Sequence, residues 1–289
     1  MTALPDWLTV HRGDAPLILS FPHTGSDFPP ELTERYASPW LAQRDTDWWV
    51  HHLYAFAAEA LGATTLRTSI SRSVIDVNRD PSGASLYPGQ NTTGLCPLTT
   101  FDNEPLYRDG EAPDEAEIQA RRAQWFDPYH AALQAEITRL RAKHPRVVLY
   151  DAHSIRSHIP HLFDGQLPQF NIGTNLDRSC DAALTDAVEA LCAGSGMSHV
   201  RNGRFKGGWI TRHYGAPADG VHALQMELAC RGYMHEPDRV SPDNWPSPWL
   251  PENAAPLRAV LAEVLRACLA FATDPTLPSS SSSSSGNPA

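Results

Sequence analysis

The sequence contains 289 residues, of which 42% are hydrophobic and 19% are charged, and its formal net charge is -10. This length suffices for one large core, whereas the acidic balance disfavours a nucleic-acid partner, because binding a phosphate backbone needs a surplus of Lys and Arg. No apolar stretch is long enough to span a bilayer and residues 1–13 do not resemble a secretory signal, so we expect a cytoplasmic protein with no membrane partner.

The hydrophobic pattern predicts strands and helices that alternate along most of the chain. Such alternation is typical of an α/β domain in which helices cover both faces of a mixed, mainly parallel sheet. We expect a single domain over residues 1–273 and a disordered tail over residues 274–289, because this serine-rich end has too little apolar surface to fold. The predicted strands are 15–21, 64–70, 74–77, 146–150 and 221–228, and the predicted helices are 48–61, 115–143, 180–192 and 257–272.

Two histidines directly follow predicted strands. His23 lies in the PHTG turn after residues 15–21, and His153 follows residues 146–150, two positions after Asp151. In sheets of this kind, ligands bind beyond the carboxyl ends of the strands. Each imidazole can also be a hydrogen-bonded loop residue, but the two together favour a metal site. Asp151 can orient His153 or compete with it as the ligand, since residues two apart on an extended backbone project to the same side.

Asp45 and Asp47 precede two tryptophans at the start of the predicted helix 48–61. An aspartate in this position can cap the helix and interact favourably with its dipole. It can equally provide the oxygen ligand of a catalytic zinc site, which commonly uses three protein ligands such as two histidines and one carboxylate. From the residues alone, the two interpretations carry equal weight.

A polar segment over residues 71–80 carries Arg72, Asn78 and Arg79 among aspartates. Guanidinium groups bind carboxylates through paired hydrogen bonds, so these residues are candidates for binding an anionic substrate. Arginines that lie among aspartates more often form ion pairs. On spacing alone, we favour ion pairing with the aspartates of the segment.

A glycine-rich, basic and aromatic loop spans residues 202–215 and contains Arg204, Arg212 and Tyr214. It lacks the Walker pattern of nucleotide-binding loops, so a mobile loop that closes over an anionic ligand is the better interpretation. Further along, Glu227 lies in an apolar run. An unpaired carboxylate is costly there and often acts as a general acid or base, with a structural ion pair as the alternative.

Two other hydrolase chemistries find no support in the sequence. The GxSxG elbow of α/β-hydrolases is absent, and the five cysteines are dispersed, without a CxxC pair or an electropositive context. A thiol nucleophile, a disulfide framework and an all-cysteine zinc site are therefore not expected.

Nine segments carry the most distinctive residues of the chain: SFPHTG, RDTDWW, SRSVIDVNRD, NTTGLCP, LYRDG, DAHSIRSHIP, LFDG, NGRFKGGWITRHYG and QMELACRGYM. In this order they resemble the N-formylglutamate amidohydrolase (deformylase) family of histidine degradation, from about residue 17 to residue 235. The resemblance implies hydrolysis of N-formylglutamate to glutamate and formate. It also implies a zinc carboxypeptidase-like (phosphorylase/hydrolase-like) α/β fold, distantly related to aspartoacylases, and Zn2+ or another divalent metal as cofactor.

The resemblance further implies a zinc ion held by two histidines and a carboxylate, and His23 and His153 match the two histidine positions. The related peptidases carry a glutamate three residues after the first histidine, where this chain has Ser26. The carboxylate must therefore come from elsewhere in the chain. Asp45 is our first choice and Asp47 our second.

The same kinship implies that Glu227 is the general base and later the general acid, and that Arg72 stabilises the oxyanion.

Two alternative functions stay open. One is another zinc amidohydrolase that acts on a small acidic N-acyl or N-formimino amino acid, and the other is a non-catalytic carboxylate-binding protein on the same scaffold. No oligomeric state is predicted. The resemblance implies that Asn78 and Arg79 bind a substrate carboxylate, and we expect Arg204 or Arg212, together with Tyr214, to complete the binding of the two carboxylates.

Overall fold

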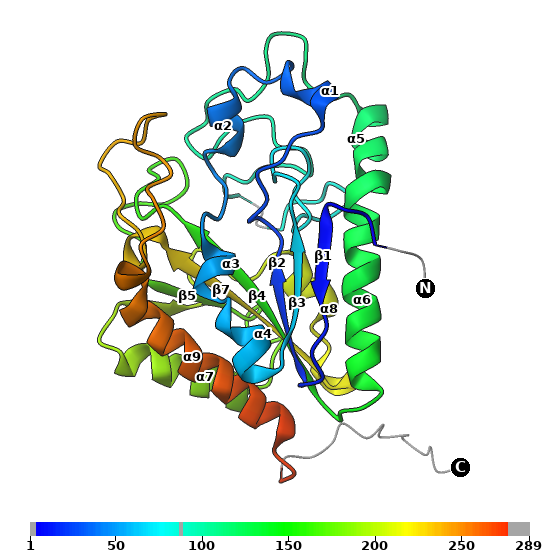
Figure 1. Ribbon diagram of the computed structural model, residues 1–289, viewed down its shortest axis with the longest axis vertical. Coiled ribbons are helices and arrows are strands. Elements are labelled where there is room, and N and C mark those ends of the chain that lie inside the picture. Colours follow the sequence, from blue (N-terminus) through cyan, green and yellow to red (C-terminus); the bar gives the residue numbers. More distant parts are fainter. Residues whose placement is uncertain (1–3, 87–88, 277–289) are drawn as a thin grey trace.

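A mixed β-sheet forms the centre of the protein, as Figure 1 shows for the computed structural model, which describes residues 4–86 and 89–276. Within these residues its seven strands are β1 (Leu8–His11), β2 (Leu17–Phe21), β3 (Thr64–Thr68), β4 (Val147–Ile155), β5 (Phe170–Gly173), β6 (His199–Arg201) and β7 (Val221–Ala229). Their order in the sheet is β1-β3-β2-β4-β7-β5-β6. Only β1–β3 and β5–β7 pair in antiparallel fashion among the described strands, so the predicted mixed, mainly parallel sheet is confirmed.

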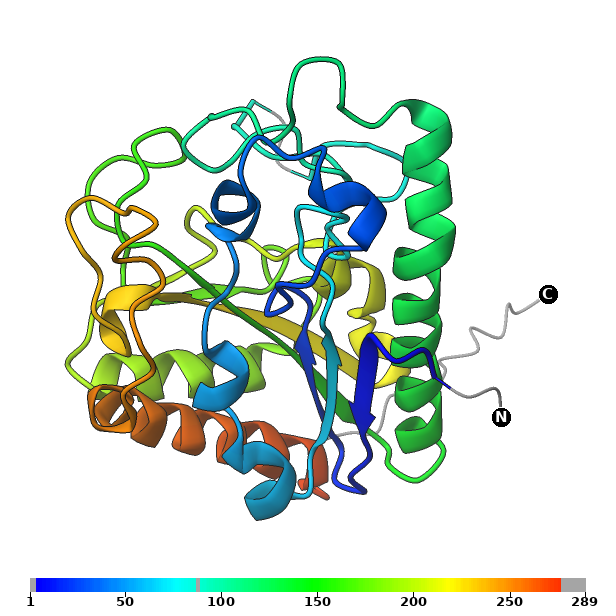
Figure 2. The same ribbon diagram turned by 45° about the horizontal axis from the view of Figure 1, so that its top comes forward.

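Helices cover both faces of this sheet, as predicted (Figure 1, Figure 2). One face packs against α3 (Val50–Leu53), α4 (Phe56–Leu61), α7 (Ala182–Gly194) and α9 (Pro251–Thr273). The other packs against α5 (Glu115–Arg121), the π-turn η1 (Arg122–Phe126), α6 (Asp127–Arg141) and α8 (Trp209–Tyr214). The short helices are α1 (Pro30–Thr33), α2 (Pro39–Gln43), η2 (Pro217–Asp219) and η3 (Cys230–Gly232). In the described part of the chain, every helix is too short or too polar to cross a bilayer.

The alternation of side chains along β4 brings two polar residues to one face of the sheet. Tyr150 belongs to the core beneath α7 and α9, whereas Val147 and Leu149 belong to the core beneath α6. Because successive side chains of a strand point to opposite faces, Asp151 and His153 continue the row of Val147 and Leu149. Both are buried.

β7 presents a matching row beside it. Gln225 and Glu227 follow the core residue Ala223 at intervals of two and therefore face the same side. The parallel register pairs Asp151 with Gln225, and His153 with Glu227. Four polar side chains thus lie side by side near the carboxyl ends of two central strands, where α/β sheets bind their ligands.

Several element boundaries differ from the predictions. β4 continues to Ile155, so His153 lies inside the strand and not in a loop after residue 150. The predicted helix 48–61 is two short helices, because α3 ends at Leu53 and α4 begins at Phe56. β1, β5 and β6 were not predicted, since strands of three or four residues are too short to show a clear alternation.

The prediction of a strand over residues 74–77 was wrong. This segment folds as consecutive turns around Asp76, whose carboxylate accepts a hydrogen bond from the Asn78 backbone N–H at 2.9 Å. Val74, Ile75 and Val77 are buried in the core beneath α6. Their apolar pattern therefore reflects burial and not pairing in the sheet.

The last helix, α9, begins six residues earlier than predicted and ends at Thr273. Pro251 occupies its first turn, where the missing N–H of proline has no helical partner to lose. The predicted disordered tail begins at residue 274, and from residue 277 onward it lies outside the described residues.

His130 connects α6 to the segments beside the polar rows. Its Nε2 donates to the Val77 carbonyl at 2.8 Å, and its Nδ1 accepts from the Tyr214 hydroxyl at 2.9 Å. The Tyr214 hydroxyl also donates to the His130 carbonyl at 3.2 Å, and the imidazole packs against Phe126 with ring centroids 4.1 Å apart. Burial lowers the pKa of His130 to about 4, the Val77 carbonyl opposes this shift, and the nearby His213 adds to it.

We expect His130 to make the protein less stable as the pH falls from about 6.5 to about 4. Its folded-state pKa lies below the unfolded value, so the unfolded state binds the proton preferentially and acid favours unfolding, by up to about 3 kcal/mol. The variant His130→Gln keeps a donor for Val77 but does not titrate. Its midpoint of urea unfolding should decrease less between pH 7 and pH 5 than that of the wild type, and an equal decrease would contradict this assignment.

Candidate metal site and its cavity

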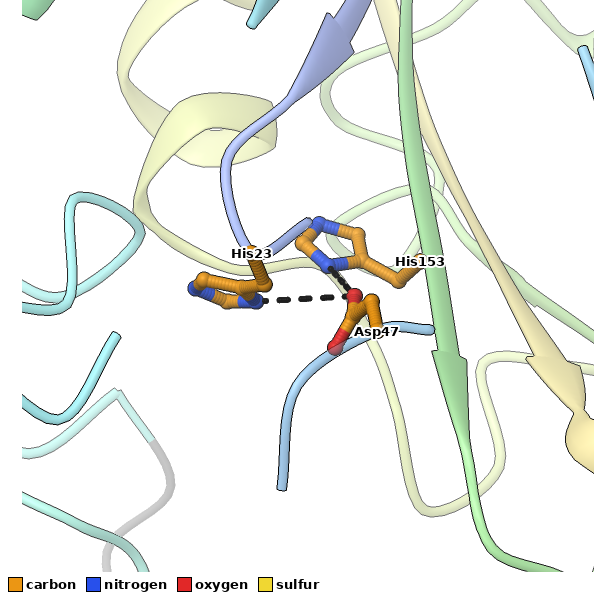
Figure 3. Close-up of side chains that lie close together, drawn as sticks. All are labelled: His23, Asp47 and His153. Atoms are coloured by element: carbon orange, nitrogen blue, oxygen red, sulfur yellow. Dashed lines mark hydrogen bonds and ion pairs between the residues drawn. The ribbon is translucent and has the colours of Figure 1, made fainter. Parts of the chain in front are cut away.

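His23, Asp47 and His153 form a buried group in which one donor atom from each residue lies within 4.8 Å of the others (Figure 3). The three residues come from the turn after β2, the connection after α2, and β4. The Asp47 Oδ2 is 3.0 Å from the His153 Nδ1 and 3.7 Å from the His23 Nδ1. The Asp47 backbone N–H also donates to the His23 carbonyl at 2.9 Å, which holds the two segments together.

Each imidazole of this group is oriented by a second carboxylate. The His23 Nε2 is 2.7 Å from the Asp76 Oδ1, and the His153 Nε2 is 2.9 Å from the Asp151 Oδ2. Because these carboxylates accept a hydrogen from each Nε2, both Nδ1 atoms are turned toward Asp47. Histidine ligands of metals typically have such an outer carboxylate, which determines the tautomer and the ring orientation.

The group satisfies the chemical requirements of a divalent-metal site. Two imidazole nitrogens and one carboxylate oxygen are a common donor set for catalytic zinc. The His23 Nδ1 is buried and has no hydrogen-bond partner, which is costly unless a ligand such as a cation is bound. Although burial opposes ionisation, interactions with His153 and His23 hold the pKa of Asp47 well below its usual value, so this carboxylate is available as an anionic ligand.

Asp45, our first choice for the carboxylate, is not in this group. Its Oδ2 accepts a hydrogen bond from the Phe101 backbone N–H at 2.7 Å, and its Oδ1 is 3.5 Å from the Arg156 Nη2. Between α2 and α3 the chain directs the Asp45 side chain toward Phe101 and Arg156, and the Asp47 side chain toward the two histidines. Asp47, our second choice, is therefore the carboxylate beside the histidines. Neither residue caps α3 through its side chain.

A cavity of about 290 Å³ opens beside the buried group. Asp47 does not line this cavity, and neither do Asp45, Arg212 and Tyr214. The residues predicted from the sequence that line the cavity are His23, Arg72, Asn78, Arg79, His153, Arg204 and Glu227.

Glu227 faces the cavity from β7, directly opposite His153 in the sheet, and only 6% of it is exposed. Gln225 on the same strand lies with its Nε2 3.2 Å from the Glu227 Oε2. Burial raises the pKa of Glu227 to about 8, with His153 lowering it and Asp47 raising it. A carboxyl group of this kind can accept and release a proton near neutral pH, as a general base or acid must.

Arg72 lines the cavity and also forms the ion pairs that its spacing suggested. Its Nη2 donates to the Asp76 Oδ2 at 2.8 Å, and its Nη1 lies 3.4 Å from the Asp47 Oδ1. Asp76 thus connects Arg72 to His23. The sequence analysis did not name Asp76 as a site residue, and the only signal for it was its position between Arg72 and Arg79 in the segment 71–80. Arg79 donates from Nε to the Thr93 carbonyl at 3.1 Å.

Asn78 uses its side-chain amide within the protein. Its Nδ2 donates to the Asp151 Oδ2 at 2.8 Å, and its Oδ1 accepts from the Ile210 backbone N–H at 2.7 Å. A Cβ on Gly208 would come within 2.5 Å of the Asn78 Nδ2, so glycine is required for this close approach. Asn78 therefore connects the carboxylate that orients His153 to the start of α8.

The 202–215 loop meets the cavity only through its first half. The Arg204 Nε donates to the Leu162 carbonyl at 2.9 Å and its Nη2 to the Asn91 carbonyl at 2.8 Å, which joins three segments at the cavity edge. Arg212 instead donates to the Gly207 carbonyl at 2.8 Å. Tyr214 lies at the end of α8 beside His130.

The chain is similar to known proteins over nearly its whole length. A sequence model of the family N-formylglutamate amidohydrolase matches residues 15–234. A Pseudomonas aeruginosa protein named N-formylglutamate deformylase is 47% identical over 265 residues, which cover 91% of this chain and 96% of the relative. A Pseudomonas putida protein of the same name is 44% identical over 268 residues, covering 92% of this chain and 97% of the relative.

One solved structure similar to this fold is that of N-formylglutamate amidohydrolase from Ralstonia eutropha, with a TM-score of 0.73, 25% identity, and coverage of 90% of this chain and 96% of the other. A gene product of Agrobacterium tumefaciens has the same fold, with a TM-score of 0.68, 20% identity, and coverage of 92% and 96%. The matched regions include every strand that carries a residue of the site.

Proposed function

Because this chain belongs to the N-formylglutamate amidohydrolase family, we propose that it hydrolyses N-formyl-L-glutamate to L-glutamate and formate and that it requires a divalent metal ion, preferably zinc. The observation that carries the proposal is the buried group of His23, Asp47 and His153 beside a cavity that also contains Glu227. The names of the two Pseudomonas relatives support the choice of substrate.

His23, Asp47 and His153 are the residues that would hold the metal, with Asp76 and Asp151 as the outer carboxylates. A divalent cation supplies Lewis acidity, which polarises a carbonyl oxygen and lowers the pKa of water. The protein residues prepare this chemistry by keeping both Nδ1 lone pairs and the Asp47 carboxylate directed to one point.

Glu227 accepts the proton of the attacking water and then donates it to the leaving amine. Its burial at the cavity wall and its raised pKa suit both steps, because a group with a pKa near the working pH can serve first as base and then as acid. Arg72 supplies positive charge where the oxyanion of the tetrahedral intermediate develops. Its ion pairs with Asp76 and Asp47 hold the guanidinium beside the two histidines.

Arg79 and Arg204 are the cavity-lining arginines that we assign to the two carboxylates of the substrate. Guanidinium groups suit this role because they bind carboxylates with paired hydrogen bonds. We assign Asn78, Arg212 and Tyr214 a different role from the carboxylate binding expected from the sequence. Asn78 lines the cavity, but its amide is engaged by Asp151 and by the Ile210 N–H. Arg212 and Tyr214 do not line the cavity and bind Gly207 and His130 instead. All three side chains therefore support the site.

The decisive experiment compares the metal-replete enzyme with the chelated enzyme. We expect formate release from N-formyl-L-glutamate to fall by at least about 10³-fold on chelation, because the Lewis acid is lost, and to return when Zn2+ is added back. Equal rates in both preparations would reject the metal mechanism. The same assay with N-acyl-aspartate and N-formimino-glutamate separates this function from the other amidohydrolases, and a complete lack of turnover would favour a carboxylate-binding protein.

A further inference from the structure

A tight turn over residues 99–103 forms one wall of the cavity, with Phe101 at its tip. The Asn103 backbone N–H donates to the Thr100 carbonyl at 2.9 Å, and Asn103 has a positive φ of 65° that closes the turn. Flanking the turn, the Thr100 N–H donates to the Glu104 carbonyl at 2.9 Å. The Phe101 side chain is 8% exposed and packs with Ile155 in a small apolar cluster.

This turn is anchored to the segments that carry the candidate metal ligands. Asp45, two residues before Asp47, accepts the Phe101 backbone N–H at 2.7 Å. Arg156, three residues after His153, is 2.5 Å from the Asp102 carboxylate next to Phe101. These anchoring groups are mostly buried, so the position of the Phe101 ring is tied closely to that of the two ligand segments.

The Phe101 ring covers one face of the Arg72 guanidinium, whose central carbon is 4.8 Å from the ring centroid. The edge of the same guanidinium contacts Asp47 and Asp76. Glu227, Arg72 and Phe101 line the same cavity, so a carbonyl that is held between Glu227 and Arg72 has the Phe101 ring as a neighbour.

We propose that Phe101 is a specificity-determining residue that restricts the acyl group to formyl, and that Asp45 is the positioning residue that holds it in place. This inference rests on the proposed function, since it assumes that the acyl carbon lies beside Arg72. A formyl group presents only a hydrogen toward the ring, whereas an acetyl group presents a methyl. A wall that is anchored by the Asp45 hydrogen bond and the Arg156–Asp102 ion pair cannot move aside cheaply, so the larger group is rejected by a steric clash.

The test measures kcat/KM for N-acetyl-L-glutamate and for N-formyl-L-glutamate in the wild type and in Phe101→Ala. We expect the acetyl-to-formyl ratio to rise by at least about 10-fold in the variant, because one methyl group in a tight pocket discriminates by 10-fold or more. Phe101→Leu preserves more of the apolar packing and should give a smaller rise. Since the ratio is taken within each preparation, a partly unfolded variant does not distort it.

Phe205→Ala is the matched control. Phe205 lines the same cavity, but its ring stacks on Arg204, whose central guanidinium carbon is 5.3 Å from the ring centroid, and not on Arg72. Its acetyl-to-formyl ratio should stay within about 2-fold of the wild type, as expected for a position away from the acyl group. The inference would be overturned if the acetyl-to-formyl ratio were unchanged in both Phe101 variants, or if it rose as much in Phe205→Ala as in Phe101→Ala. In either case, formate release by the wild type would still support the proposed function. No formate release by the wild type would overturn both.

The role of Asp45 is tested by the same ratio. Asp45→Ala removes the acceptor of the Phe101 N–H, so the turn relaxes and the ratio should rise. Asp45→Asn keeps an oxygen acceptor and should remain closer to the wild type. A rise of equal size in Asp45→Asn and Asp45→Ala, or no rise in Asp45→Ala, would show that Asp45 does not position Phe101 through this hydrogen bond.

Discussion

Replacing Glu227 with Gln is expected to lower kcat for N-formyl-L-glutamate by about 10³-fold, the middle of the range for a lost general base. The amide has nearly the same shape, so it can keep the contact with Gln225 at the cavity wall. It cannot accept the proton of water. Glu227 is not a member of the candidate metal group, so the variant should retain its metal, and KM should change little.

Three measurements check this prediction: formate release, metal content by mass spectrometry, and the midpoint of thermal unfolding. The midpoint should not decrease, because burial raises the pKa of Glu227 to about 8 and so already favours its neutral form, and the amide of Gln is neutral and has nearly the same shape. Glu263→Gln, the same change on the exposed side of α9, is the matched control and should retain full activity. Retention of more than about a tenth of the wild-type kcat in Glu227→Gln would exclude it as the general base.

The second large effect concerns the two aspartates near residue 46. Asp47→Asn should lose its bound metal on dialysis, and formate release should fall by at least about 10³-fold, because the anionic ligand is replaced by a neutral amide. Asp45→Asn is the matched control at a distance of two residues. It should retain the metal, since the Asp45 carboxylate contacts the Phe101 backbone and Arg156 instead.

Metal content decides between the two residues independently of activity. Both variants should remain folded at 25 °C, and circular dichroism can check this. In each variant the amide oxygen can still accept the backbone hydrogen bond that the carboxylate accepts: from the Ser154 N–H at Asp47, and from the Phe101 N–H at Asp45. Loss of metal from Asp45→Asn with retention in Asp47→Asn would reverse our assignment of the carboxylate ligand.

The fold class and the two histidines were predictable because their signals are local. An apolar run followed by a polar residue marks the end of a buried strand, and alternation along the chain assigns each side chain to a face. These rules put Asp151 and His153 on one side of the strand, as the structure has them. They also identified Glu227 as a carboxylate in an otherwise apolar strand.

The choice between Asp45 and Asp47 was not predictable in this way. Both lie in an irregular connection, where no periodic rule assigns the direction of a side chain. Their orientations depend on backbone groups from elsewhere in the chain: the His23 carbonyl, which accepts the Asp47 N–H, and the Phe101 N–H, which donates to Asp45. The role of Asn78 was not predictable for the same reason. Its side-chain oxygen accepts the Ile210 N–H of α8, a contact that depends on how α8 packs against the segment 71–80.

Residue type and spacing therefore specified the elements, the faces of the strands and the kinds of chemistry that the chain carries. The assembly of the site depended on contacts between residues far apart in sequence. Asp76 reaches His23 across 53 positions, and Asp47 reaches His153 across 106. Such contacts form only when the sheet brings separate segments together, since hydrogen bonds and ion pairs act over a few ångströms whereas sequence patterns describe only neighbouring residues.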